Sequence, residues 1–231
     1  MKDAHEKSAQ DPEQPRYPDD GELPIELPLV HEHASLDARF SDFGPYRVPY
    51  DYGPEETLDE VMNHPLLIDM SYQGLMRVSG QDAYYFLQTM CTADIASLTA
   101  IGGFELSLLL TSDAGIIDMI EVVKTGDEEF LIVANAPHAR EVSAWLSANA
   151  RIADDEGAVF PDLSVQDESG VLAQFVMIGP RATDSLAELA GCRFTDTPHN
   201  GTIHLFQIED IPLMTVDEKV GEHEGLRLFF P

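Results

Sequence analysis

Basic residues, cysteines and long apolar runs are scarce in this sequence of 231 residues. Thirteen Lys and Arg stand against 42 Asp and Glu, which gives a formal net charge of −29. Because phosphate binding needs clustered Lys and Arg, this balance argues against nucleic acid and against an anionic membrane as partners. The acidity is typical of a solvated acidic surface, and it also fits a cationic partner or a salt-rich habitat.

The few cysteines and the short apolar runs indicate where in the cell the protein is located. Cys91 and Cys192 have neither CxxC spacing nor a partner nearby in the sequence. We therefore expect free thiols in a reducing cytoplasm. No apolar run approaches the length that spans a membrane, and the N-terminus has no signal-peptide apolar core. The sequence thus predicts a cytoplasmic protein with no membrane partner.

The chain divides into a tail and a folded part. Residues 1–26 are polar and acidic and contain four prolines. They offer too little apolar surface to offset the entropy lost on ordering, so we predict a flexible acidic tail. Residues 27–231 suffice for one large domain or two small ones, because 44% of the chain is hydrophobic.

A helix is predicted near the start of the folded part. Leu29, His33, Leu36 and Phe40 have the spacing of one helix face. His31 and His33 lie two residues apart and so face different sides of such a helix, which is poor geometry for a shared metal ion. We predict no metal site.

The central stretch of the sequence predicts three strands joined by two tight turns. The turns are Ser112-Asp113-Ala114-Gly115 and Gly126-Asp127. The predicted strands are Leu106–Thr111, Ile116–Lys124 and Phe130–Ala134. Such a succession is an antiparallel meander.

The middle strand of this meander carries two carboxylates, Asp118 and Glu121. A carboxylate inside such a strand points either to solvent or to a ligand. Strict alternation places Asp118 on one face with Ile116, and Met119 on the other with Ile117 and Glu121. Met119 is interpreted most simply as a core methionine that fills apolar space.

The meander resembles that of the glycine-cleavage T-protein (aminomethyltransferase) family. The sequence LSLLLTSDAGIIDMIEVVK, followed by FLIVANAPH, is similar to the family pattern YxLLLNexGGIIDDxxVY followed by FLLVVNAxN. Other segments follow in the family's order, with DMSYQG at DxSHxG and IGPRA at QGPKA. The resemblance covers the chain from about Leu27 to its last residue.

The resemblance implies a fold, and it implies which of the family's domains the chain contains. The fold class would be α+β, with antiparallel sheets in two interwoven ferredoxin-like subdomains, as in the folate-binding domain of aminomethyltransferases. Residues 27–231 would form this domain without the C-terminal β-barrel of the family. The strand Leu226–Phe230 would then lie uncovered, and a homodimer or a partner subunit would cover it.

The resemblance also implies site residues. The family's reaction carboxylate is the second Asp of its IDD motif, which is Met119 here. Asp118, the first Asp of that motif, is then the candidate catalytic residue. Leu106 stands where the family has a tyrosine, and Arg227 where it has the glutamate that binds the pterin. Met119, Leu106 and Arg227 make this a degenerate version of the family's site.

Two further residues complete the candidate cofactor-binding set. Asn135, at the end of the third meander strand, is a polar site residue that the sequence retains. Glu222 is either a hydrogen-bond acceptor of the site or a solvated turn residue. The implied cofactor is tetrahydrofolate, and the implied partner is a folate-like small molecule.

Two functions follow from the resemblance, and both stay open at this point. One is a tetrahydrofolate-binding protein of one-carbon metabolism which, if active, would be an aminomethyl- or methyltransferase. The other is a non-catalytic binding or assembly protein, or one subunit of a multi-chain transferase. A neighbouring chain that carries the missing barrel would support the first, whereas Met119, Leu106 and Arg227 favour the second.

Overall fold

The computed structural model of the chain describes residues 24–53, 63–191, 203–220 and 223–231. Most of the predicted tail lies outside these residues, as do Glu222 and Cys192. The described part begins just before β1 (Ile25–Glu26), a short strand that pairs in parallel with β3 (Tyr46–Asp51). The last two residues of the predicted tail are therefore part of a sheet.

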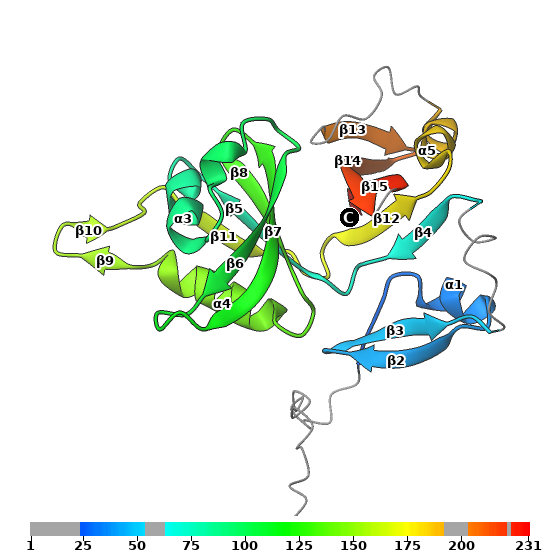
Figure 1. Cartoon of the computed structure of the whole chain (residues 1–231), viewed down its shortest axis with the longest axis horizontal. Coiled ribbons are helices and arrows are strands. Elements are labelled where there is room, and N and C mark those ends of the chain that lie inside the picture. The colour runs from blue at the N-terminus through cyan, green and yellow to red at the C-terminus, as the bar shows by residue number, and fades with distance from the viewer. Residues whose placement is uncertain (1–23, 54–62, 192–202, 221–222) are drawn as a thin grey trace, which may run out of the picture.

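Two five-stranded antiparallel sheets dominate the molecule (Figure 1). The strands of the first sheet are, in spatial order, β11 (Ser164–Asp167), β5 (Gly74–Ser79), β8 (Glu129–Ala134), β7 (Ile116–Gly126) and β6 (Phe104–Leu110). Those of the second sheet are β13 (Ile203–Ile208), β14 (Ile211–Val220), β15 (His223–Phe230), β12 (Ala173–Ile178) and β4 (Leu66–Asp69).

The remaining elements are smaller and surround these two sheets. A third sheet has the order β1, β3 and β2 (Arg39–Phe43), and a small hairpin consists of β9 (Ala153–Asp154) and β10 (Gly157–Ala158). The helices are α1 (Val30–Ser35), α3 (Ala83–Met90), α4 (Ala139–Asn149), α5 (Ala182–Ala190) and the short 3-10 helix η1 (Ile95–Ser97).

The chain passes twice between the two large sheets. It leaves the second sheet at β4, enters the first sheet at β5, and returns from β11 to β12. Neither sheet is therefore built from one continuous stretch of sequence. This interweaving confirms the predicted α+β fold with antiparallel sheets.

The predicted meander is present as β6, β7 and β8, with one irregularity. Leu109 lies opposite Asp118, but Leu110 lies opposite Ile116, so Ile117 is an extra residue in β7. Such a bulge reverses the alternation of side chains on its far side. Ile116 is accordingly exposed and Ile117 buried, and their predicted faces were wrong.

The first sheet buries one face under α3 and α4. Phe86 and Leu87 of α3 pack with Phe130 and Ile132 of β8 and with Leu146 of α4, and all five are almost fully buried. Burial of such a side chain contributes about 1.5–3 kcal/mol. The amphipathic spacing of the two helices thus fixes which face of the sheet is left for the second sheet.

The two large sheets pack on each other through a small core. Leu75, Val123 and Leu131 of the first sheet contact Val216 and Phe229 of the second. Burial of apolar side chains from both sheets holds them face to face over this stretch. The first sheet extends beyond this core at β6 and β7, where its face stays partly open.

The strand predicted to lie uncovered, Leu226–Phe230, is an inner strand of the second sheet between β14 and β12. Leu226, Leu228 and Phe229 are buried, with Leu226 and Leu228 packed near Leu186 of α5. The prediction that this strand is exposed was therefore wrong. The homodimer or partner subunit itself stays a prediction.

Among the described residues, no helix combines the length and the apolar character needed to cross a membrane.

Candidate functional site

The open part of the first sheet carries exposed apolar side chains on the face turned toward the second sheet. Leu106 on β6 is 54% exposed and Met119 on β7 is 56% exposed. The register places Leu106 opposite Glu121, and Leu108 opposite Met119. Because opposed residues of antiparallel strands share a face, these side chains form one surface. We call Leu106, Met119, Glu121 and Arg227 the candidate site.

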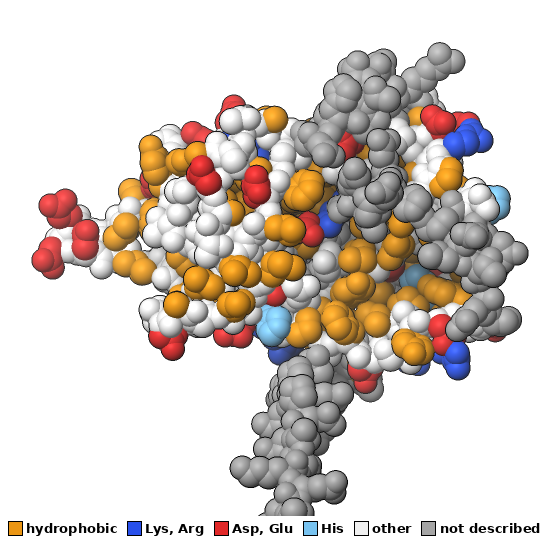
Figure 2. Space-filling model, in the orientation of Figure 1, with side chains coloured by type: hydrophobic (Ala, Val, Ile, Leu, Met, Phe, Trp, Pro, Cys, Tyr) orange, Lys and Arg blue, Asp and Glu red, His pale blue; other side chains and the backbone are white. Residues whose placement is uncertain are grey.

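Hydrophobic side chains gather on this side of the molecule. Figure 2 shows them across the middle of the view, from the lower ends of β6 and β7 toward β4 and β12. Large apolar side chains left in water forgo the free energy of burial. Contiguous exposed apolar surface of this kind marks places where a ligand or another molecule binds.

Met119 belongs to this surface and not to the core. Its exposure contradicts the interpretation that it fills apolar space inside the protein. The physical reason lies in the two faces of β7. Ile117, Ile120 and Val122 supply the apolar contacts to the helix-covered core, and Met119 lies on the other face.

Asp118 is buried and acts as a hydrogen-bond acceptor at the end of β8. Its two oxygens accept hydrogen bonds from the backbone N–H and the side-chain amide of Asn135, each at 2.8 Å. The backbone N–H of Met119 donates a third, at 2.9 Å. Asp118 is only 4% exposed. The carboxylate is thus engaged in joining β7 to the end of β8.

Asn135 is exposed and lies where β8 leaves the sheet. Besides its bond to Asp118, its side-chain amide donates to the backbone carbonyl of Met119 at 3.1 Å. Asn135 therefore lies next to the candidate site and fixes the backbone there. Its amide N–H groups are directed inward to β7, so it is a positioning residue in this structure.

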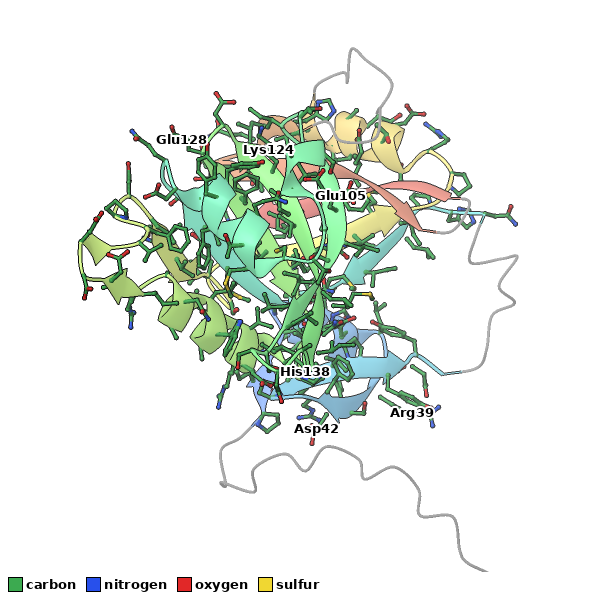
Figure 3. All side chains as sticks on the ribbon, turned by 60° about the vertical axis from the view of Figure 1, so that its left-hand side comes forward. Arg39, Asp42, Glu105, Lys124, Glu128 and His138 are labelled. Carbon is green, nitrogen blue, oxygen red and sulfur yellow. The ribbon has the colours of Figure 1, made fainter. Side chains whose placement is uncertain are left out.

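The third sheet lies against this end of β8. Ala136 packs with Leu27 and Tyr46 in one buried cluster. Figure 3 shows His138, at the start of α4, beside the third sheet, and Glu105, Lys124 and Glu128 at the far end of the first sheet. The end of the meander that carries Asn135 is thus enclosed by the N-terminal elements.

Arg227 reaches across from the second sheet to Glu121 of the first. Its Nη1 lies 2.7 Å from Glu121 Oε2, and its Nη2 donates to Oε1 at 3.2 Å. The Arg227 side chain is 6% exposed and that of Glu121 is 24% exposed. Only the Nη2 contact has hydrogen-bond geometry, and the Nη1 contact is a close ion pair. Arg227 thus joins the two sheets by an ion pair with Glu121, and its predicted role in ligand binding stays a prediction.

Hydrogen bonds and close packing stabilise the chain where it crosses from β4 to β5, at the motif Asp69-Met70-Ser71-Tyr72-Gln73-Gly74. Asp69 accepts a hydrogen bond from the backbone N–H of Ser71 at 2.9 Å. The Ser71 hydroxyl donates to the carbonyl of Gln174 and accepts from its N–H. A Cβ on Gly74 would lie 2.4 Å from that of Ala139. These residues hold the crossing in place.

One cluster near this crossing was missed by reasoning from the sequence. The hydroxyl of Tyr52 lies 2.8 Å from Nδ1 of His33, and Nε2 of His33 lies 3.5 Å from Oδ2 of Asp69. His33 and Asp69 are both buried. Since the three residues come from three separate segments, no local spacing in the sequence could have shown that they meet.

Glu222 lies outside the described residues, so its two interpretations stay predictions. Within the described ranges, no group of three or more His, Cys, Asp and Glu side chains is placed to hold a metal ion.

The chain matches the family described as the GCVT N-terminal domain over residues 29–216. It is 32% identical over 163 residues to an aminomethyltransferase of Anoxybacillus flavithermus, which is 70% of this chain and 42% of that protein. It is 34% identical over 166 residues to one of Corynebacterium jeikeium, which is 71% of this chain and 39% of that protein. The matches thus span about two fifths of these curated relatives.

A solved structure has the same fold over most of the chain. It is the glycine cleavage system aminomethyltransferase T from Bartonella henselae, with a TM-score of 0.73 and 26% sequence identity. The match covers 91% of this chain and 54% of that protein. The fold therefore agrees with that of this aminomethyltransferase over the part that is shared.

Proposed function

The chain belongs to the GCVT N-terminal domain family, and from this premise we propose that it binds a reduced folate at the candidate site without catalysing aminomethyl transfer. The observation that carries the proposal is the surface formed by exposed Leu106 and Met119 beside the paired Glu121 and Arg227. An apolar surface with few polar groups at its rim is the usual composition of a small-molecule site.

The residues present fit the flat ring system of a folate. Leu106 and Met119 offer apolar contact to its faces, and methionine adapts well to aromatic partners. The carboxylate of Glu121 would accept hydrogen bonds from ring N–H groups only after parting from Arg227. Bound tetrahydrofolate would supply the nitrogen atoms that carry a one-carbon unit. The protein's part would be to bind and orient the ring.

The absence of catalysis is inferred from the ionisable groups near this surface. Met119 has no proton to transfer. Asp118 is buried and accepts three hydrogen bonds, and Glu121 is paired with Arg227. A general acid or base must reach the reacting atom with its proton or lone pair free. None of these three side chains offers that in the described arrangement.

Calorimetric titration with 5-formyltetrahydrofolate, a stable reduced folate, tests the proposal. We expect saturable binding by the parent protein and loss of at least tenfold in affinity for Met119→Arg, which places a charge on the apolar surface. The matched control is Leu189→Arg, because Leu189 is 68% exposed on α5 and outside the site. Equal affinities of the parent and Met119→Arg would refute the proposal.

The second candidate function, a non-catalytic binding or assembly protein, is favoured by the same exposed apolar surface. In that case the surface would contact another macromolecule and reduced folate would not bind. The titration separates the two candidates. Absent folate binding together with Met119-dependent association in sedimentation would favour the second.

A further inference from the structure

We propose that two copies of this chain associate through the edge of the second sheet, where β13 of one copy pairs antiparallel with β13 of the other around Leu205. The two five-stranded sheets would then continue into one another. This edge is separate from the candidate site, and the inference does not depend on the proposed function.

The edge strands of the two large sheets differ in how well they are protected against pairing. They are β11 and β6 in the first sheet and β13 and β4 in the second. The edge of β6 is covered, because the Thr92 N–H donates to the carbonyl of Leu108 and the Leu108 N–H donates to the Thr92 hydroxyl. β4 and β11 have four residues each and end in an aspartate. β13 has six residues, and none is Asp, Glu, Lys, Arg or Pro.

The outer side of β13 can therefore accept another strand. Figure 1 shows β13 at the end of the second sheet, and within the described ranges its strand partner is β14 alone. An edge strand directs backbone N–H and C=O groups away from its neighbour, and charged residues and prolines are what usually prevent a second chain from pairing there. β13 lacks both devices.

Leu205 is the side chain that a second copy would cover. It is 77% exposed. The register places it opposite Met214, which in turn lies opposite Phe229. Since Phe229 packs against the first sheet, Leu205 lies on the face turned toward that sheet. There it lines a groove of about 540 Å³ together with Met214 and Phe229. Its own exposure shows that the groove is open on this side.

A second copy closes this side by symmetry. Antiparallel pairing around Leu205 places the two Leu205 side chains directly opposite each other on one sheet face, with Cβ atoms about 4.5–5.5 Å apart. Each copy then supplies the wall that the groove of the other lacks. The added strand is already folded in its own sheet, so it brings no ordering cost to the association. This favours a second copy over an extended segment of another protein.

The charge of the chain selects the antiparallel orientation. Glu209 and Asp210 follow β13 directly and are exposed. In a parallel pair these acidic residues of the two copies would lie side by side. In the antiparallel pair the two Glu209 residues are separated by eight strand residues, or roughly 26 Å. This separation exceeds the Debye length of about 8 Å at physiological ionic strength. The remaining repulsion comes from the net charge of −29 on each copy, and salt screens it.

Sedimentation velocity over about a hundredfold range of protein concentration, in about 0.05 and 1 M sodium chloride, tests the association. We expect a dimer of the parent protein that is stronger in high salt. Leu205→Asp and Leu205→Lys should each weaken it at least tenfold, because like charges then meet at the symmetry axis. An equal mixture of the two variants should associate again, since Asp then faces Lys. Circular dichroism checks that each variant is folded.

Two controls show whether the effect belongs to this edge. Leu189→Asp changes a leucine on α5 that is 68% exposed, and it should associate like the parent. Met119→Arg should also associate like the parent, because Met119 is on the first sheet. Association that Met119→Arg abolishes and Leu205→Asp leaves intact would overturn the inference and assign the contact to the candidate site.

Disulfide formation tests the pairing around Leu205 directly. Opposed residues of an antiparallel pair have Cα atoms about 4.5–5.5 Å apart, within the span of about 4.4–6.8 Å that a disulfide bridges. Under mild oxidation, Leu205→Cys should therefore form a covalent dimer at least tenfold faster than Leu189→Cys. Both variants keep Cys91 and Cys192, so the natural thiols contribute equally to the two rates.

Three results would overturn the inference. The first is a parent protein that stays monomeric at every concentration in both salt conditions, including one that instead binds a different protein at β13. The second is association of Leu205→Asp as strong as that of the parent, or a mixture with Leu205→Lys that associates no better than either variant alone. The third is equal rates of disulfide formation at positions 205 and 189.

Discussion

Two neighbouring side chains on β7, Asp118 and Met119, lie in opposite environments, one buried and one exposed. This difference decides which chemical groups the candidate site presents to a ligand. Asp118 is buried with its hydrogen bonds satisfied, whereas Met119 is exposed on the candidate site. The ionisable group is therefore held away from the surface where a ligand would bind. The residue on that surface contributes contact area and no charge.

The first prediction concerns catalysis. With aminomethylated carrier protein and tetrahydrofolate, we expect methylenetetrahydrofolate to form roughly 10²-fold or more slowly than with an aminomethyltransferase that has the carboxylate, because general acid–base catalysis contributes about that much. Met119→Asp restores a carboxylate at this position and should raise the rate, whereas Met119→Asn should not. Parent turnover within tenfold of an ordinary aminomethyltransferase would contradict the prediction.

The second prediction concerns the thiol of Cys91. Burial raises the pKa of this thiol to about 11, and its hydrogen bond with Ser107 offsets part of the rise. A raised folded pKa means that the folded state keeps the proton longer than the unfolded state does. The stabilising contribution is thus complete below the ordinary pKa of ~8.5 and is lost as pH rises toward 11.

Urea denaturation between pH 7 and 10.5 measures this effect. The free energy of unfolding of the parent should fall more steeply above pH 8.5 than that of Cys91→Ala. Cys192→Ala serves as the comparison, since it removes the other thiol of the chain. Parallel curves for the parent and Cys91→Ala would show that Cys91 does not contribute.

The residues of the candidate site could be predicted in part. The family pattern indicated Leu106, Met119 and Arg227; in the structure Leu106 and Met119 are exposed on one face of the first sheet, and Arg227 is buried beside Glu121. The ion pair between Arg227 and Glu121 could not be predicted, because it joins two sheets whose packing is not encoded in local spacing. The exposure of Met119 was missed because an apolar side chain in a strand is more often buried.

At the scale of elements, the strands of the meander were predicted well. All three agree with the sequence pattern within a few residues. The first helix was predicted too long, since Leu29 to Phe40 has helical spacing but α1 ends at Ser35. Asp37 has a positive φ of 59°, which ends the helix, and β2 begins at Arg39.

The third prediction concerns the pairing of β15 with β12. A Cβ on Gly225 would lie 2.5 Å from the carbonyl oxygen of Met177 and 2.7 Å from a methyl group of Ile178. Gly225→Ala should therefore lower the free energy of unfolding by about 1–3 kcal/mol. In Gly126→Ala, the control, the new methyl group would lie 3.3 Å from Cβ and 3.9 Å from the backbone nitrogen of Glu129. Equal urea midpoints for both variants would contradict this.

The fourth prediction also concerns β15. Because Phe229 is 2% exposed between the two sheets, Phe229→Asp should unfold the protein instead of dissociating an oligomer. Loss of a buried Phe side chain costs about 3–5 kcal/mol even without a buried charge. Circular dichroism would report the loss of structure, with Leu205→Asp, at a residue 77% exposed, as the control. A folded Phe229→Asp protein would show that β15 is not the inner strand described.

At the scale of the whole molecule, the net charge of −29 destabilises the folded state through electrostatic repulsion. Like charges on a compact surface repel one another, and salt screens them over a Debye length of about 10 Å at 0.1 M and 3 Å at 1 M. The described salt bridges, such as that of Arg77 with Glu168 and Glu129, neutralise only a few of these charges.

The fifth prediction follows from this repulsion. The melting temperature should rise steadily as sodium chloride is raised from about 0.05 to 1 M, because screening lowers the energy of the compact state. Potassium chloride should act equally, since screening depends on ionic strength and not on the identity of the cation. A melting temperature that stays constant or falls over this range would contradict the argument.

The interwoven path of the chain has a consequence for biosynthesis. β4 pairs with β12, so residues 66–69 leave the ribosome long before their partner at residues 173–178 exists. At about 5–20 residues per second the wait is roughly 5–20 s. The first sheet can close during that time, but the second cannot. A nascent chain of this protein therefore presents an unpaired strand bearing Leu67 and Ile68, a natural client for a chaperone that shields apolar segments during translation.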